Sequence, residues 1–194
     1  MSQVRIAIFA SGNGSNAEAI IRYFKNSDHV TIVLLLSNNP NAYALTRATN
    51  HGIRTKVFDR EKFRETDQIL NWLDEAEITH IVLAGFLWLI PSNILQAYGG
   101  HIINIHPSLL PKHGGKGMYG MKVHEAVKAA GDLESGITIH VVDANYDEGK
   151  VIFQASCAIA EQDGPEEIAA KVHELEYQHF PVVIEKWIFN RLSP

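Results

Sequence analysis

Two polar side chains alternate with apolar ones in the segment Ile102–Pro111. If this segment is a strand, Asn104 and His106 point to the same face, because successive side chains of a strand alternate. An amide and an imidazole aimed at one point can polarise a carbonyl oxygen and stabilise the oxyanion of a tetrahedral intermediate. The pair therefore indicates carbonyl chemistry, although capping of a strand end is an equally good interpretation of the two residues taken alone.

Asp143 and Asp147 flank a short turn further along the chain, and His140 comes just before them. Turn aspartates are commonly solvated, and that interpretation holds if nothing pairs with them. A histidine that stabilises an oxyanion as a cation needs a carboxylate neighbour to raise its pKa. One of the two aspartates is the candidate partner of His106, while His140 is as suited to supporting the site as to the chemistry itself.

A glycine-rich motif at residues 12–17 fits the pattern G-x-G-x-x-A of dinucleotide-binding folds. The second expected strand ends in residues 37–39, Ser-Asn-Asn, and no carboxylate follows until Asp59, so the acidic partner of a dinucleotide ribose is missing. A helix N-terminus with Ser15 and Asn16 would still bind a phosphate monoester. A loop that only makes the turn is the alternative.

Buried strands and amphipathic helices alternate around these motifs. We expect strands at residues 5–10, 30–36, 55–58, 78–84 and 102–105, and helices at 17–25, 42–50 and 61–76. This order predicts an α/β fold, a doubly wound, mostly parallel Rossmann-like sheet. Alternating side chains at 137–141 and 151–155 predict an antiparallel C-terminal extension. A final helix from residue 166 to about 190 should kink or split at Pro181.

Ligands of such sheets bind beyond the carboxyl ends of the strands. We therefore expect the glycine-rich loop and the strand end at Asn104 and His106 to open into one cleft. The chain has 194 residues, of which 46% are hydrophobic, and this predicts a single domain over residues 1–194.

Composition limits the partners and the location. The net charge of −5 disfavours a protein that coats nucleic acid. A single cysteine, Cys157, and the lack of a signal-peptide pattern or a long apolar run indicate a cytoplasmic protein with no membrane contact. Cys157 is best interpreted as a buried bystander. No histidine pair has metal-ligand spacing, so we expect no metal.

Four segments, in this order, resemble the folate-dependent formyltransferases: residues 11–16, 83–86, 104–111 and 147–149. The resemblance covers essentially the whole chain, and the block at 104–111 is highly specific. It implies transfer of a formyl group from 10-formyltetrahydrofolate, as co-substrate, to a primary amine without metal or covalent enzyme intermediate. The implied acceptor is glycinamide ribonucleotide, in de novo purine biosynthesis.

The resemblance also implies roles for particular residues. The catalytic set would be Asn104, His106 and Asp147. The ribonucleotide, through its phosphate and neighbouring groups, would contact Gly14, Ser15, Asn16 and Glu176. The folate would contact Arg60, Leu87, Trp88, Leu89, Ile90, Asn104 and Asp143.

Residues 112–121 depart from the family pattern, because a longer, glycine-rich loop stands where a short Tyr-Pro-Gly type of loop is expected. Its glycines indicate either a mobile flap or close backbone approach to a ligand. Chain length and acidic charge disfavour the relatives that act on tRNA or hydrolyse the folate. An amino-sugar nucleotide as acceptor, a dinucleotide-dependent oxidoreductase and a silent nucleotide- or folate-binding module remain open. We expect small-molecule substrates and a monomer or homodimer.

Overall fold

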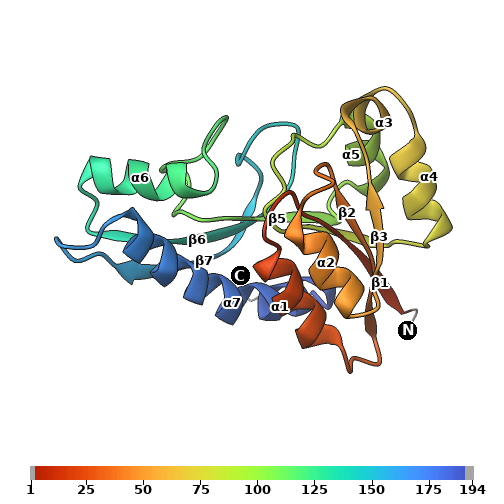
Figure 1. Cartoon of the computed structure of the whole chain (residues 1–194), viewed down its shortest axis with the longest axis horizontal. Coiled ribbons are helices and arrows are strands. Elements are labelled where there is room, and N and C mark those ends of the chain that lie inside the picture. The colour runs from red at the N-terminus through yellow and green to blue at the C-terminus, as the bar shows by residue number, and fades with distance from the viewer. Residues whose placement is uncertain (1–2, 191–194) are drawn as a thin grey trace. The chain divides into compact units, whose positions relative to one another are not determined.

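The structure is a computed structural model that describes residues 3–190. The described residues divide into two compact units, and the boundary falls between Ile103 and Asn104. The seven strands form one sheet in the order β3-β2-β1-β4-β5-β6-β7 (Figure 1). The expected doubly wound, mostly parallel sheet is confirmed. The expectation of a single domain stays a prediction.

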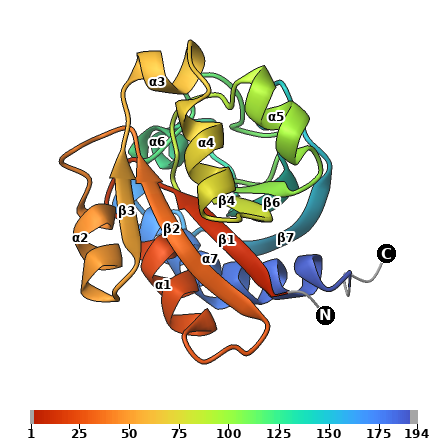
Figure 2. The same cartoon turned by 90° about the vertical axis from the view of Figure 1, so that its right-hand side faces the viewer.

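The first unit is a parallel α/β layer. Its elements are β1 (Val4–Phe9), α1 (Ser15–Phe24), β2 (Val30–Ser37), α2 (Tyr43–Asn50), β3 (Arg54–Val57), α3 (Arg60–Arg64), α4 (Gln68–Glu75), β4 (His80–Leu83), α5 (Ser92–Tyr98) and the start of β5 (Ile102–His106). Strand β1 pairs in parallel with both β2 and β4, and β2 pairs with β3. Figure 2 shows α1 and α2 on one face of β1–β3 and α4 on the other.

Strands β1 and β2 are buried almost throughout because helices cover both faces of the sheet. Ile6, Ile8 and Phe9 have no exposed surface. Helix α1 buries Ala17, Ile20, Ile21 and Phe24, which recur at helical spacing. The sheet therefore holds the loops at its strand ends on a rigid base.

The second unit contains the end of β5, α6 (Met121–Ala130), β6 (Glu134–Val141), β7 (Val151–Ala158) and α7 (Pro165–Ile188). Strands β6 and β7 pair antiparallel from Glu134 opposite Ala158 to His140 opposite Val151. The expected antiparallel C-terminal extension is thereby confirmed. Helix α7 packs against β6, β7 and α6.

Three expectations about helices were wrong. The single helix expected at residues 61–76 is two helices, because Glu65 closes α3 and the Thr66 hydroxyl bonds both the Lys62 carbonyl and the Gln68 N–H. Helices α5 and α6 were not expected. Helix α7 runs as one helix through Pro181, so the expected split is wrong, while the alternative of a kink stays a prediction.

Candidate active site

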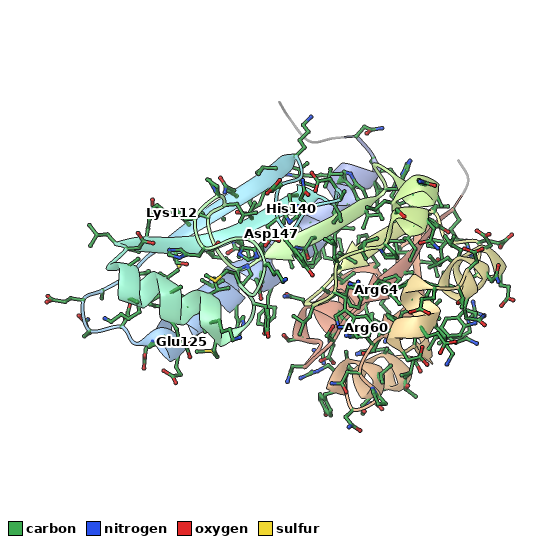
Figure 3. The ribbon with its side chains drawn as sticks, turned by 90° about the horizontal axis from the view of Figure 1, so that it is seen from above. Arg60, Arg64, Lys112, Glu125, His140 and Asp147 are labelled. Atoms are coloured by element: carbon green, nitrogen blue, oxygen red, sulfur yellow. The ribbon has the colours of Figure 1, made fainter. Side chains whose placement is uncertain are left out.

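Asn104 and His106 lie at the carboxyl end of β5, and Asp147 follows β6 in a left-handed backbone conformation with φ 58°. The Nδ1 atom of His106 is 3.4 Å from Oδ2 of Asp147. His140 Nε2 lies 3.6 Å from the other carboxylate oxygen and 3.2 Å from the Asn104 amide nitrogen. The second unit thus brings the three expected catalytic residues together, and His140 joins them. Figure 3 shows His140 and Asp147 close to each other.

Backbone carbonyls determine which ring nitrogens carry hydrogen. His106 donates from Nε2 to the carbonyl of His113 at 2.8 Å, so its Nδ1 is the atom that faces Asp147. His140 donates from Nδ1 to the carbonyl of Val141 at 3.0 Å. The Nε2 atom of His140 faces the Asn104 amide nitrogen as well as Asp147, and the Asn104 amide has two N–H groups to donate.

Burial dominates the acid–base properties of this cluster. His106 is only 3% exposed, and burial lowers its pKa, although the Asp147 carboxylate and the His113 carbonyl act in the opposite direction. The expectation that a carboxylate raises the pKa of this histidine is therefore correct for the influence of Asp147 and wrong for the net direction. Burial also opposes ionisation of Asp147, but hydrogen bonds and charges from His140, His106 and Gly115 keep its pKa low.

The Asp143 carboxylate has a different partner from that of Asp147. Its Oδ1 accepts the N–H of Asn145 at 2.9 Å, which is a turn contact within its own loop. Of the two aspartates that the sequence offered, Asp147 is the partner of His106.

The glycine-rich loop after β5 holds both members of the catalytic pair. The His113 carbonyl accepts from His106, and the Gly115 N–H donates to Asp147 Oδ2 at 2.9 Å. Gly115 and Gly117 have φ of 93° and 92°, which L side chains rarely adopt. The glycines thus have a conformational role, while the mobile flap stays a prediction.

The first unit contains the glycine-rich loop for which the sequence predicts phosphate binding. Gly14 caps α1 with φ 76°, and a Cβ atom there would lie 2.4 Å from the Ala44 Cβ and 2.5 Å from its Cα. Helix α2 therefore packs so closely on the loop that only glycine fits. Ser15 begins α1 and Asn16 follows it, so both lie in the first turn of the helix.

The sequence did not reveal the role of Arg47 of α2, which binds Asn13 of this loop. Its Nε donates to the Asn13 carbonyl and its Nη2 to the Asn13 side chain, both at 3.0 Å. Its remaining guanidinium nitrogen pairs with Glu18, which also contacts Arg22 and His51. The hydrogen bond with His51, followed by those with the two arginines, lowers the pKa of Glu18 to about 2 against the effect of burial. No local motif identifies a contact between residues 34 positions apart.

Two of the residues that the resemblance assigns to folate, Arg60 and Trp88, belong to or contact an aromatic cluster in the first unit. The Arg60 guanidinium lies 5.6 Å from the centre of the Trp88 ring, and Figure 3 shows Arg64 one turn further along α3. Trp88 contacts Phe58, Phe63 and Phe86. Leu87 is 44% exposed, Ile90 is buried, and Leu89 lies between these extremes.

Three further observations concern residues 3–190. Glu176 of α7 is buried in the second unit. Among residues 3–190, no three His, Cys, Asp or Glu side chains are grouped closely enough to hold a metal ion. No helix within the same residues has the length and apolar character to cross a bilayer.

Known proteins similar to this chain agree with its fold and with the family that its sequence resembles. The sequence model of the formyl transferase family matches residues 4–184. A chloroplastic phosphoribosylglycinamide formyltransferase of Vigna unguiculata is 39% identical over 193 residues, which are 97% of this chain and 62% of that protein. The Bacillus subtilis protein named phosphoribosylglycinamide formyltransferase is 38% identical over 187 residues, 94% of this chain and 93% of its own.

A crystal structure of phosphoribosylglycinamide formyltransferase from Bacillus halodurans superimposes with a TM-score of 0.85 at 35% identity and covers 95% of both chains. The chain spans less than two thirds of the plant relatives, 62% and 64% of their lengths. The match to the family model nevertheless extends over most of the sequence. The chain therefore belongs to the formyl transferase family.

Proposed function

We propose that this chain transfers the formyl group of 10-formyltetrahydrofolate to the amine of glycinamide ribonucleotide in purine biosynthesis. The observation that supports it most is the cluster at the end of β5, where His106 Nδ1 faces an ionised Asp147 and Asn104 lies on the same strand. The names of the similar proteins agree with this acceptor.

In this proposal the amine attacks the formyl carbon and the formyl oxygen gains negative charge. Asn104 donates an amide N–H to that oxygen, a contact that strengthens as the charge develops. His106, neutral at rest because burial lowers its pKa, becomes protonated as the intermediate forms, and Asp147 stabilises the imidazolium. The amine proton passes through water and this pair to the folate nitrogen. The bond from the formyl carbon to that nitrogen then breaks and releases tetrahydrofolate.

The binding roles follow the family correspondence and are part of the proposal. The ribonucleotide phosphate binds the backbone N–H groups at Gly14, Ser15 and Asn16, since the N-terminus of a helix attracts anions. Glu176 contacts the same substrate. The folate binds Arg60, Leu87, Trp88, Leu89, Ile90, Asn104 and Asp143. We propose no metal, a cytoplasmic location, and a monomer or homodimer.

Incubation of the purified protein with 10-formyltetrahydrofolate and glycinamide ribonucleotide tests this function through the absorbance change of the folate. We expect formylated ribonucleotide and tetrahydrofolate in equal amounts. An amino-sugar nucleotide in place of the ribonucleotide tests the alternative acceptor, and titration with NAD tests the oxidoreductase. Formylation of the sugar alone, or tight NAD binding without any transfer, would overturn the proposal.

A further inference from the structure

Asp132 lies outside the catalytic cluster, between α6 and β6, and holds two consecutive residues of the loop that follows β5. Its Oδ2 atom is 2.7 Å from His113 Nε2, and its Oδ1 atom is 3.0 Å from Lys112 Nζ. The carboxylate is 16% exposed. The hydrogen bond from His113, with that from Lys112, lowers the pKa of Asp132, so it is an anion at neutral pH.

The position of Asp132 is itself fixed by the end of α6. Gly131 adopts the left-handed conformation with φ 67°, and the Gly131 and Asp132 N–H groups bond the carbonyls of Lys128 and Val127. This is the usual way in which a helix ends at glycine. Asp132 is therefore a rigid anchor for a loop that contains several glycines.

His113 needs such an anchor. It has φ 53°, which is uncommon for a residue other than glycine. Its carbonyl in this conformation accepts the hydrogen bond of His106 Nε2 at 2.8 Å. A cavity of about 200 Å³ lies against Lys112, His113 and Asp132, so the loop has room to relax if the anchor is lost.

We propose that Asp132 is a positioning residue of the reaction, which sets the orientation and tautomer of His106 by holding the carbonyl of His113. The expected effect on kcat rests on the function proposed above, whereas the expected effect on the tautomer of His106 does not. With the carbonyl in place, Nε2 carries the hydrogen and Nδ1 faces Asp147. Without it, the ring of His106 loses the contact that selects this tautomer.

The electrostatic surroundings of His106 fix the sign of the effect. Asp147, His140, His113 and His124 are the titratable groups that act on it or on which it acts. The hydrogen bond from His106 Nε2 to the backbone carbonyl of His113 favours the protonated ring of His106. Loss of the anchor should therefore lower the pKa of His106 further.

The Asp132→Ala and Asp132→Asn variants test the proposal. We expect Asp132→Ala to lower kcat about 10-fold or more while the KM values change less than about 3-fold, because the defect lies in the orientation of a catalytic group. Asp132→Asn keeps an acceptor and should lose less. Asp163→Asn is the matched control, since Asp163 is also paired with a lysine, Lys171, in the same unit. It should leave kcat unchanged.

Nitrogen NMR of labelled histidine gives a second readout that needs no substrate. We expect neutral His106 in the wild-type protein to carry its hydrogen on Nε2, and in Asp132→Ala to show a mixture of tautomers and a lower pKa. His113→Gly, which keeps the left-handed backbone but lacks the anchored ring, should behave likewise and serves if Asp132→Ala does not fold. Unchanged tautomer and kcat in these variants, or an equal loss in Asp163→Asn, would overturn the proposal. An altered tautomer in a protein that forms no product would contradict only the proposed reaction.

Discussion

At the scale of single residues, opposing influences on His106 and Asp147 define the candidate chemistry. Burial favours a neutral histidine, while the adjacent carboxylate favours the cation. Such a histidine changes its charge when a negative oxygen forms beside it, which is the property that formyl transfer requires. The two residues should therefore act as one unit.

His106→Ala and Asp147→Asn should each lower kcat by about 100-fold, with much smaller changes in KM, because both act on the transition state. The double variant should be little worse than either single one. Steady-state kinetics of the four proteins measures this. Glu148→Gln is the matched control, because Glu148 is an exposed carboxylate next to Asp147 that accepts from the Asn145 amide, and it should leave kcat near the wild-type value. Fully multiplicative losses would mean that the two residues act independently.

Gly14→Ala should weaken binding of the ribonucleotide, because the added methyl group meets both the backbone and the side chain of Ala44 and the backbone is left-handed. We expect KM for the ribonucleotide to rise about 10-fold or more, with a smaller effect on KM for the folate. Gly12→Ala is the control, because a Cβ atom at Gly12 meets nothing within 4 Å. Equal kinetics for the two variants would argue against this loop as the phosphate site.

At the scale of elements, α2 holds the glycine-rich loop, which we propose binds phosphate, in a fixed conformation. The Ala44 N–H donates to the Gly12 carbonyl, and Arg47 donates twice to Asn13. Loop carbonyls are thereby turned toward α2, which leaves N–H groups at the start of α1 for an anion.

Arg47→Ala should raise KM for the ribonucleotide about 10-fold while kcat changes little, because the loop loses its support but the catalytic cluster does not. Arg22→Ala is the matched control. Arg22 pairs with the same Glu18, but its side chain is 68% exposed and its guanidinium bonds Glu18 within α1. Calorimetric titration with ribose 5-phosphate gives an independent measure of the same site. A similar loss in both variants would assign the effect to Glu18 and not to the loop.

Elements that a local sequence pattern marks could be predicted from the sequence. Features that depend on contacts between residues far apart in the chain could not. The strands at residues 5–10 and 30–36 follow from continuous apolar runs, which only a sheet covered on both faces needs. The break after Glu65 depends on the Thr66 hydroxyl, and no periodicity reveals it. Arg47 and Asp132 have ordinary helical or turn surroundings in the sequence, so their partners become visible only in the fold.

At the scale of the whole molecule, buried histidines couple stability to pH. Burial lowers the pKa of His80 and of His124 to about 4, from an unfolded value of 6.5. Between these two values the unfolded chain binds more protons than the folded one, so stability falls as pH falls from 6.5 toward 4. Glu18, with its pKa lowered from 4.5 to about 2, contributes to the loss only below pH 4.5. The loss between pH 6.5 and 4.5 therefore belongs to the histidines.

His124→Phe isolates one part of this effect. The side chain is 2% exposed and its Nδ1 atom is buried without a hydrogen-bond partner, so phenylalanine removes both a titrating group and an unsatisfied one. We expect the variant to be at least as stable as the wild type at pH 7.5. It should lose less stability on acidification, by up to about 3 kcal/mol over the full window down to pH 4. Urea unfolding at pH 7.5, 6 and 5 measures the difference. Parallel stability curves for the two proteins would show that the pKa of His124 is the same in the folded and unfolded states. Its burial would then not contribute to the pH dependence of stability.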